Sequence, residues 1–367
     1  MNRTTKIVIA VVAVVAVAAI AFFGIRNQMR KRTGDETVIK IGAILPLTGI
    51  NADAGNSVKV GLELGINDVN SAGKQKYQLI CYDTKSEAKQ AVQGFQKLNS
   101  VDKAQYYFTT LSDNSLAIKP LAISNKQVLF CLASHNLITK DSKSLVFRPI
   151  NTGVDEAIFL TQYIKNRVKP SKILFYIFNT EAGADVKRIY EKEFDPARRK
   201  FIVYDDGTFH TKDITTPANF SGFDCILIVG YSPTMGVLVK NLREAGYKGR
   251  IIANLGFNNQ SVIKAAGKYA DGIWYNDYDF PYDATFYKNM VLAAQKQQSN
   301  FTALSFIAYS CVKLIDMMSY QSDKTPTNVA MHISNAKEVK INEVFFYPHP
   351  NGSITSKYKM RKISIGE

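Results

Sequence analysis

Residues 38–73, VIKIGAILPLTGINADAGNSVKVGLELGINDVNSAG, constrain the fold most strongly because they predict a strand, a loop and a helix in immediate succession. The apolar run 38–45 is rich in β-branched residues and lacks a helical period, which indicates a buried strand. Beyond a turn at Pro46 and Gly49, apolar side chains recur at the spacings of an amphipathic helix, at Val58, Leu62, Ile66 and Val69. In an open α/β sheet such a loop lies at the carboxyl edge, where ligands bind.

Two glycines mark one stripe of the predicted helix. Gly61 and Gly65 lie four residues apart and therefore on the same side of the helix. Because glycine has no side chain, we expect this stripe to let the helix lie close to the sheet. Gly73 ends the helix in the position that glycine favours.

The alternation of strands and helices continues along the chain. Further strands are expected at 77–83, 105–109, 127–133, 145–150, 172–178, 224–229, 250–254 and 272–279. Amphipathic segments at short spacing separate them, which predicts a doubly wound α/β fold. Two such blocks joined by extended segments predict two lobes with a ligand cleft between them. We assign 35–149 and 278–340 to the first lobe, and 150–277 and 341–367 to the second, with a hairpin around Asn351-Gly352.

The N-terminal segment predicts export. Residues 7–25 form an uncharged apolar run of 19 residues between basic flanks, and a membrane-spanning helix needs about 20. A secretory signal with a cleavage site near Ala19-Ile20-Ala21 is the competing interpretation. No cysteine follows the run, which argues against a lipoprotein anchor. We expect an uncleaved N-terminal apolar helix, within residues 1–34, that tethers the rest of the chain outside the cytoplasm.

The positive charge of the chain does not indicate nucleic-acid binding. The formal net charge is +15, and residues 1–34 hold six basic residues and no acid. Without them, 40 basic residues stand against 31 acidic ones, a net charge of +9. The remaining lysines are scattered and form no basic stripe interleaved with aromatic residues. We therefore expect a basic, solvated surface, suited to lie near anionic lipid.

Cysteine and histidine usage gives no sign of a metal site or a nucleophile. Four widely separated cysteines lie in apolar runs, as buried structural thiols do, at Cys81, Cys131, Cys225 and Cys311. The four histidines form no pair with ligand spacing. Motifs for a nucleophilic serine, a phosphate loop or a zinc protease are absent from the sequence. We expect no cofactor, no metal and no catalytic residue.

Two stretches together resemble a known family. The pattern IKIGxxxPLTG, with its helix ending in INDVNSAG, and the unit 224–256 are similar to the leucine/isoleucine/valine-binding class of type I periplasmic binding proteins of ABC importers. The resemblance extends from Val38 to the C-terminus. It implies a monomeric, non-enzymatic solute-binding protein that closes on a small ligand and meets permease subunits.

The resemblance also implies site residues. In that family, loops after the third and fourth strands bind the carboxylate and ammonium of an amino acid. In this chain, those loops contain Ser112, Asp113, Asn114, Ser134, His135 and Asn136. The alternative for Ser112, Asn114 and Ser134 is that they only cap helices, and the alternative for His135 is that it only faces solvent. From the second lobe we expect Tyr231, Asn254 and Trp274 to contribute to the cleft. Tyr231 is the main candidate for ligand contact, and the alternative is a tyrosine that only packs the hinge.

The chain departs from the family pattern where the amino-acid ammonium is bound. An acidic residue is expected just after the strand at 250–254, and Leu255 aligns there. A leucine cannot neutralise an ammonium, and burial of an unpaired charge is costly. Asp113, or Glu181 from the opposite lobe, could replace the acid. The family has an aromatic residue in the first loop, and Ala54 aligns with it in this chain. The family also often has a disulfide between the next two loops, and Ser86 and Ser112 align with its cysteines, so this chain lacks that bridge.

Three classes of function remain open on the sequence. The first is a solute-binding protein of an ABC importer for an amino acid or related compound. The second is a membrane-anchored receptor or accessory protein of the same fold, which the incomplete ammonium site and a retained anchor would favour. An enzyme is the third and has the least support, because isolated Ser or Asp residues in loops do not define a catalytic site.

Overall fold

A computed structural model of the chain describes residues 38–49, 51–73, 75–205, 210–320 and 325–365. The apolar segment 7–25, expected to be an anchor or a signal sequence, lies outside these residues. Among the residues described, no helix has both the length and the apolar character needed to cross a membrane.

The first lobe is built on a five-stranded parallel sheet in the order β2-β1-β3-β4-β5. Its strands are β1 (Ile39–Leu45), β2 (Tyr77–Asp83), β3 (Tyr106–Thr110), β4 (Val128–Leu132) and β5 (Val146–Phe147). The helices of this lobe are α2 (Ala52–Ser71), α3 (Ala88–Ser100), α4 (Ser112–Ser124), α11 (Thr285–Lys296), α12 (Ala303–Ser319) and α13 (Pro326–Asn335), with the short η1 (Asn136–Ile138). The three central strands are apolar on both faces because helices cover both sides of the sheet.

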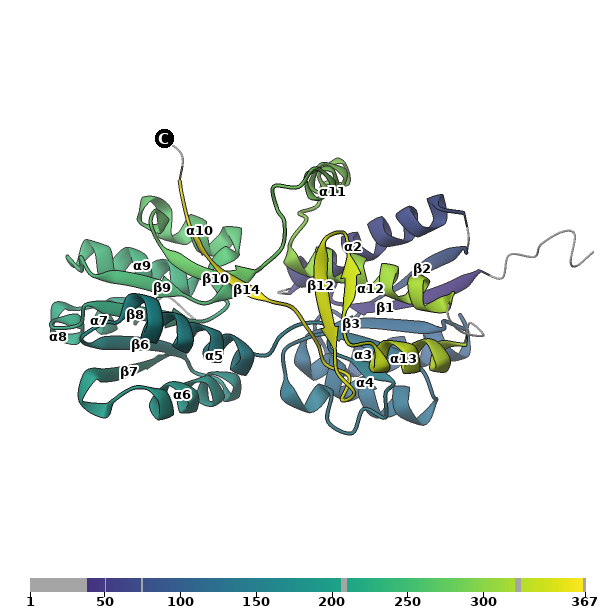
Figure 1. The fold of residues 1–367 in the computed structure, drawn as a ribbon, viewed down its shortest axis with the longest axis horizontal. Coiled ribbons are helices and arrows are strands. Elements are labelled where there is room, and N and C mark those ends of the chain that lie inside the picture. Colours follow the sequence, from purple (N-terminus) through teal and green to yellow (C-terminus); the bar gives the residue numbers. More distant parts are fainter. Residues whose placement is uncertain (1–37, 50, 74, 206–209, 321–324, 366–367) are drawn as a thin grey trace, which may run out of the picture.

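The second lobe lies beside the first along the long axis of the molecule (Figure 1). Its six-stranded sheet has the order β14-β10-β9-β8-β6-β7 and is parallel except for β14. The strands are β6 (Ile173–Phe178), β7 (Arg199–Tyr204), β8 (Cys225–Val229), β9 (Arg250–Ala253), β10 (Trp274–Tyr278) and β14 (Tyr358–Lys362). The helices are α5 (Gly153–Tyr163), α6 (Glu181–Glu193), α7 (Thr211–Ile214), α8 (Pro217–Phe220), α9 (Thr234–Glu244) and α10 (Gln260–Ala266), with η2 (Ile164–Val168), η3 (Pro196–Arg198), η4 (Leu255–Asn258) and η5 (Gly267–Ala270).

A small antiparallel sheet places part of the C-terminal region in a different lobe from the one expected. It consists of β11 (Val339–Ile341), β12 (Val344–Pro348) and β13 (Ile354–Thr355). Val344, Phe346 and Ile354 belong to the core of the first lobe, whereas the sequence assigned residues 341–367 to the second. Every second side chain of β12 is buried, and the apolar core of the first lobe is what these side chains pack against. The chain enters the second sheet only with β14.

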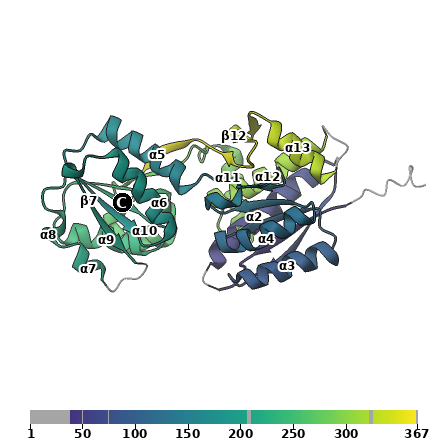
Figure 2. The ribbon, with the colours of Figure 1, turned by 90° about the horizontal axis from the view of Figure 1, so that it is seen from below.

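Three extended segments join the lobes, as the views in Figure 1 and Figure 2 show. The first leads from β5 to α5, the second leaves β10, and the third connects β13 to β14. Asn151 holds the three together. Its side chain pairs with the backbone of Ser356 through two hydrogen bonds of 2.8 and 2.9 Å, and its N–H donates to the Tyr278 hydroxyl at 3.3 Å. The three connections between the lobes are therefore joined to one another at the hinge.

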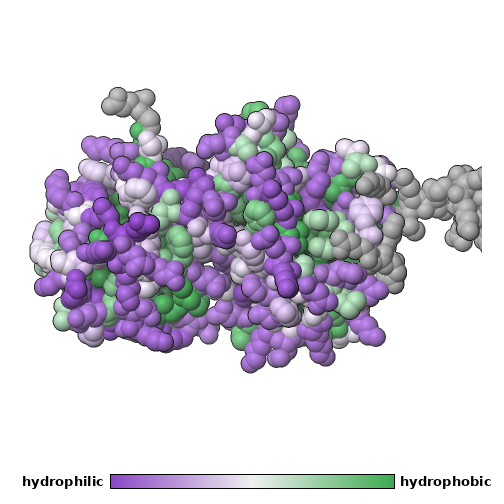
Figure 3. Space-filling view, viewed as in Figure 1, coloured by the Kyte–Doolittle hydropathy of each residue, from purple (hydrophilic) through white to green (hydrophobic). Residues whose placement is uncertain are grey.

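Hydrophilic residues cover most of both lobes on the face shown in Figure 3. Apolar residues form only small, scattered areas on this face. Single exposed apolar side chains are normal on a soluble domain. This face is therefore suited to contact with water, and the apolar side chains lie mainly in the cores of the two lobes.

The glycine stripe of α2 faces α12 and not the sheet, so that expectation from the sequence was wrong. A Cβ atom at Gly61 would collide with the backbone carbonyl of Ser305, and one at Gly65 would lie 3.0 Å from Cβ of Val312. Both partner residues lie in α12, a mostly buried helix. The two helices therefore approach each other closely because α2 lacks side chains along this stripe.

Replacing Gly61 with Ala should destabilise the first lobe. The methyl group would meet a helix backbone that cannot move without disturbing the core, and overpacking typically costs roughly 1–3 kcal/mol. Chemical denaturation of the purified variant measures the loss. Gly65→Ala is the matched control: its nearest neighbours, Cβ of Val312 and the Tyr309 carbonyl, would lie 3.0 and 3.1 Å from the new methyl group, so the helices need to shift less and its loss should be smaller. Equal stability of Gly61→Ala and the parent protein would contradict this packing.

Candidate functional site

The carboxyl edges of the two main sheets face each other across the hinge. β5 ends at Phe147 and β10 ends at Tyr278, and from each end the chain passes directly toward the other lobe. Because the main sheets are parallel apart from β14, the loops after their other strands lie on the same two edges. The polar loops identified in the sequence therefore lie where a ligand between the lobes would meet them.

In the first lobe, the residues expected at the site differ in their accessibility. Ser112 and Asp113 open α4, half-buried and exposed respectively. Asn114 is fully buried and donates from Nδ2 to the Thr84 hydroxyl at 3.0 Å, so it joins two neighbouring loops. Ser112 and Asp113 are therefore open to the space between the lobes, while Asn114 holds their loop in place.

The loop after β4 carries the second group of expected residues. Ser134 and His135 are half-buried and Asn136 is exposed. The His135 ring accepts a hydrogen bond from the N–H of Leu137 at 3.2 Å, and its carbonyl accepts one from Arg148 at 3.4 Å. His135 thus caps the short η1 and contacts the start of the hinge. Ser134 and Asn136 remain accessible.

A residue that the sequence did not indicate, Glu156, lies at the centre of the carboxyl edge of the second lobe's sheet. Glu156, in the first turn of α5, is only 3% exposed. Its carboxylate accepts four hydrogen bonds: from the Leu255 N–H at 2.7 Å, the Asn276 amide at 2.9 Å, the Asn254 amide at 3.0 Å and the Tyr231 hydroxyl at 3.0 Å. All four donors are neutral. Among the residues described, no Lys, Arg or His forms an ion pair with it.

A periodicity argument could have found Glu156. It lies four and eight residues before Leu160 and Ile164, which are fully buried on the inner face of this helical segment. An acid on an apolar stripe needs buried partners, and that need is a signal of a polar cluster. The partners themselves, on β10 and in loops about 75 to 120 residues away along the chain, were not predictable from spacing.

Tyr231 lies in the loop after β8, and its hydroxyl and its ring are in different surroundings. Its hydroxyl donates to buried Glu156, while the residue as a whole is 47% exposed. Burial of the hydroxyl and the Glu156 charge hold the pKa of Tyr231 well above its ordinary value. The ring makes an edge contact with Phe178, with centroids 5.5 Å apart. The structure therefore presents an aromatic ring, anchored at its polar end, on the edge that faces the first lobe.

Asn254 is placed differently from the expectation. It is fully buried, donates to Glu156, and accepts a hydrogen bond from the Gly230 N–H at 3.1 Å. It therefore joins the loops that follow β8 and β9. A Cβ atom at Gly256 would collide with the Gly230 carbonyl, so these loops also touch through their backbones. Asn254 therefore supports the loops of the site from beneath and is not itself exposed to a ligand.

Of the two carboxylates suggested as substitutes at position 255, neither takes the buried position. Asp113 and Glu181 are exposed at the starts of α4 and α6. Leu255 is half-buried, and its backbone N–H points at the Glu156 carboxylate. An acid thus lies directly against residue 255, although it comes from α5.

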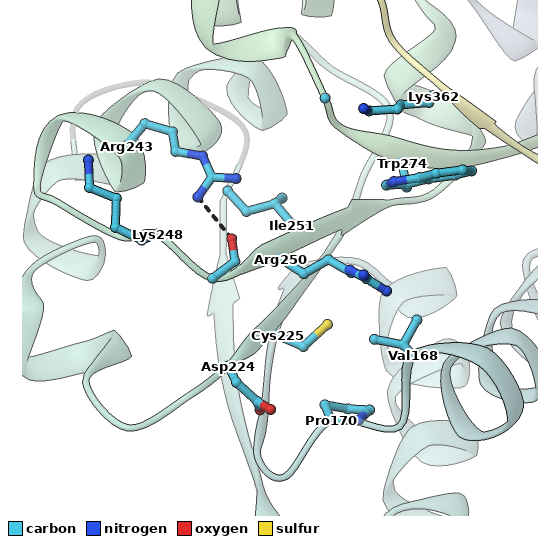
Figure 4. A pocket seen from close by; sticks show the side chains of 12 residues that line it. Val168, Pro170, Asp224, Cys225, Arg243, Lys248, Arg250, Ile251, Trp274 and Lys362 are labelled. Atoms are coloured by element: carbon cyan, nitrogen blue, oxygen red, sulfur yellow. Dashed lines mark hydrogen bonds between the residues drawn. The ribbon is translucent and has the colours of Figure 1, made fainter.

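Trp274 lies at the wrong end of the sheet for the cleft. It opens β10, whereas the cleft edge is at the other end of that strand. There it lines a pocket of about 530 Å³ together with Cys225, Arg250 and Lys362 (Figure 4). The sequence placed Trp274 on the correct strand but could not decide which end of that strand faces the ligand.

The described residues offer no metal-binding cluster. No group of three or more His, Cys, Asp or Glu side chains comes together among them. All four cysteines are free, and three are buried. Burial raises the pKa of Cys225 to about 12 and that of Cys81 to about 11. Such thiols are protonated at neutral pH and act as small apolar side chains.

Comparison with known proteins identifies the family. The model of the family described as periplasmic binding protein matches residues 38–354. The chain belongs to the periplasmic binding protein family. It is 24% identical over 243 residues to the Leu/Ile/Val-binding protein of Escherichia coli K12, a match that covers 64% of this chain and 66% of that protein, just under two thirds. It is 21% identical over 300 residues to Leu/Ile/Val-binding protein homolog 3 of Brucella melitensis, covering 80% and 82%.

Solved structures share the fold of this periplasmic binding protein. The branched-chain amino-acid transporter substrate-binding protein of Streptococcus pneumoniae, in complex with isoleucine, has a TM-score of 0.78 at 17% identity and covers 89% of this chain and 96% of its own. A solute-binding protein of an R. palustris ABC transporter, in complex with 4-hydroxybenzoate, has a TM-score of 0.75 at 19% identity, covering 90% and 94%. The similarity establishes the type I periplasmic binding protein fold.

A second buried acid of this periplasmic binding protein lies beside the hinge. Asp277 in β10 is fully buried, 3.1 Å from the Nε of Arg361. It accepts hydrogen bonds from the Tyr282 hydroxyl at 3.0 Å and the Tyr278 N–H at 2.8 Å. Burial dominates over these favourable contacts and raises the pKa of Asp277 to about 6.

Replacing Asp277 with Asn should remove a pH-dependent part of the stability. The folded pKa of about 6 exceeds the ordinary value of 3.8, so between these values the folded protein binds more protons than the unfolded chain. The resulting stabilisation is fully present below pH 3.8 and disappears as the pH rises through about 6. Relative to Asp277→Asn, the parent protein should lose roughly 2–3 kcal/mol between about pH 4 and 7. Urea unfolding across this range measures the difference, and parallel stability curves would contradict it.

Proposed function

We propose that this protein is an extracytoplasmic solute-binding protein that captures a small polar ligand between its lobes and delivers it to an ABC importer. Closure about the hinge would bring the loops of the first lobe against the Tyr231 edge of the second. A ligand that contacts both edges stabilises the closed state, because the open state offers it only one of them. The chain acts by binding, without catalysis or a cofactor.

The observation that carries this proposal is the pair of facing carboxyl edges joined by a three-segment hinge. Each edge supplies accessible groups with suitable chemistry. Ser112, Asp113, Ser134 and Asn136 offer hydroxyl, carboxylate and amide groups from the first lobe, and Tyr231 offers an aromatic ring from the second. Glu181 lies exposed at the rim. Such a combination suits a small molecule with polar ends and an apolar body.

The names of similar proteins support an amino acid or an aromatic acid as the ligand class. The relatives from Escherichia coli and Brucella melitensis are named for leucine, isoleucine and valine, and the structural neighbours hold isoleucine or 4-hydroxybenzoate. Every one of these ligands carries a carboxylate and an apolar body. We therefore propose a carboxylate-bearing compound of that size, bound by one monomer, with the segment 7–25 as a tether to the membrane.

Titration with candidate ligands tests the proposal directly. Leucine, isoleucine, valine and 4-hydroxybenzoate are added separately to the purified protein, and thermal unfolding is recorded. A ligand at one hundred times its dissociation constant should stabilise the protein by about 2.7 kcal/mol, a shift of a few degrees. Co-purification with permease subunits then tests delivery. Absence of a shift with all four ligands would contradict the proposed capture.

Replacing Tyr231 with Ala should weaken binding of the ligand that gives the shift. Loss of a half-exposed ring from the cleft edge removes apolar contact, and truncation of such an aromatic typically costs more than about 2 kcal/mol. Calorimetric titration measures the loss. Tyr231→Phe keeps the ring and removes only the hydroxyl bonded to Glu156, so its loss should be smaller than that of Tyr231→Ala. Equal affinities of the Ala variant and the parent protein would place the ligand elsewhere.

A receptor or accessory protein of the same fold is the alternative function. The observation that favours it is Leu255, where amino-acid-binding relatives are expected to have an acid. The structure weakens this argument because Glu156 lies against that position. Ligand binding without any association with permease subunits would favour the receptor.

A further inference from the structure

Glu156 is a buried charge that is solvated by hydrogen bonds and has no described counter-ion. Each carboxylate oxygen accepts two hydrogen bonds, so the group is satisfied as an acceptor. Neutral donors do not cancel its charge. Its position in the first turn of α5 adds the favourable dipole of the helix N-terminus. The negative field of this residue therefore extends to the nearest surface.

That nearest surface is the cleft edge of the second lobe. One of the four donors, the Tyr231 hydroxyl, belongs to a side chain that is otherwise half-exposed. Two others, Asn254 and Asn276, are fully buried, and the fourth is the backbone of half-buried Leu255. Tyr231 and Leu255 therefore separate Glu156 from a bound ligand.

We propose that Glu156 sets the charge preference of the ligand site, by attracting a positively charged group of the ligand toward the Tyr231 ring. This inference rests on the proposed function and adds a ligand property to it: the ligand carries an ammonium. Glu156 has the electrostatic role that is expected of an acid at position 255, although Tyr231 and Leu255 separate it from the ligand. It is a positioning residue, since both of its oxygens are occupied and the ligand does not touch it.

Two physical effects act in the same direction. A cation over an aromatic face is attracted by the electron density of the ring, and donation of the Tyr231 hydroxyl to a carboxylate increases that density. The Glu156 charge also acts directly. By Coulomb's law with an effective dielectric constant near 20, a unit charge within roughly 10 Å changes the affinity for a cation by about tenfold or more.

The test compares leucine with 4-methylpentanoate, which has the same body and carboxylate but lacks the ammonium. Both are titrated calorimetrically into the full-length protein and into Glu156→Gln, which keeps the shape of the side chain and removes its charge. The parent protein should bind leucine more tightly. In Glu156→Gln the affinity for leucine should fall about tenfold or more, while that for 4-methylpentanoate stays constant or rises.

Two matched variants isolate the effect. Glu244→Gln removes an equal charge from an exposed position at the end of α9, and it should leave the leucine preference unchanged. Glu181→Gln removes the exposed carboxylate at the rim of the cleft. If Glu181→Gln abolishes the preference and Glu156→Gln does not, the inference is wrong.

The remaining outcomes separate this inference from the proposed function. Equal losses for both compounds in Glu156→Gln would show a purely structural role and overturn the inference. A parent protein that prefers 4-methylpentanoate would also overturn it, and this result needs no variant to fold. In both cases the protein still binds a small ligand, so the proposed function stands. Binding of neither compound, nor of isoleucine, valine or 4-hydroxybenzoate, would instead reject the proposed function.

Discussion

One buried carboxylate connects the parts of the second lobe that face the first. The hydrogen bonds of Glu156 reach the loop after β8, the loop after β9 and the strand β10, and they start from the helix that follows the first hinge segment. A carboxylate at this depth is tolerated only because every lone-pair direction finds a donor. The same requirement fixes the positions of the donors. Loss of any one of them would therefore disturb the others.

The hinge follows the same physical logic with neutral groups. Asn151 pairs with the Ser356 backbone as a strand would, and Tyr278 stacks on Tyr358 with centroids 5.2 Å apart. Tyr278 and Tyr358 also lie within the field of Glu156, which adds to the effect of burial in raising the pKa of both hydroxyls. The hinge and the ligand-facing edge are thus adjacent parts of one polar cluster.

Periodicity and turn residues predicted most of the fold. The strand at 38–45, the helix beyond Gly55 and the alternation that follows are local patterns, and the structure contains them nearly where expected. The predictions failed where the answer depends on partners distant in sequence. The Gly61 stripe packs on α12 because the C-terminal helices return to the first lobe. Trp274 lies at the far end of its strand, and β12 packs on the first lobe, because neither orientation nor lobe is encoded in a strand's own pattern.

The candidate site was predictable in its loops but not in its charge. Tyr231 and the loops beginning at Ser112 and Ser134 lie on facing edges because all follow parallel strands. Leu255 stands where the resemblance implies an acid, and the sequence suggested only Asp113 or Glu181 as a replacement. An aligned position, however, specifies a side chain, whereas a ligand responds to the electrostatic field, which can originate from any element nearby. Glu156 shows the difference: it lies 99 residues before Leu255 and donates no atom to the surface, yet it accepts the hydrogen bond of that residue's backbone. In the proposed mode of binding, a charge beneath the surface leaves the side chain of Leu255 available for the apolar body of a ligand, while Glu156 attracts the ligand's ammonium toward the ring of Tyr231.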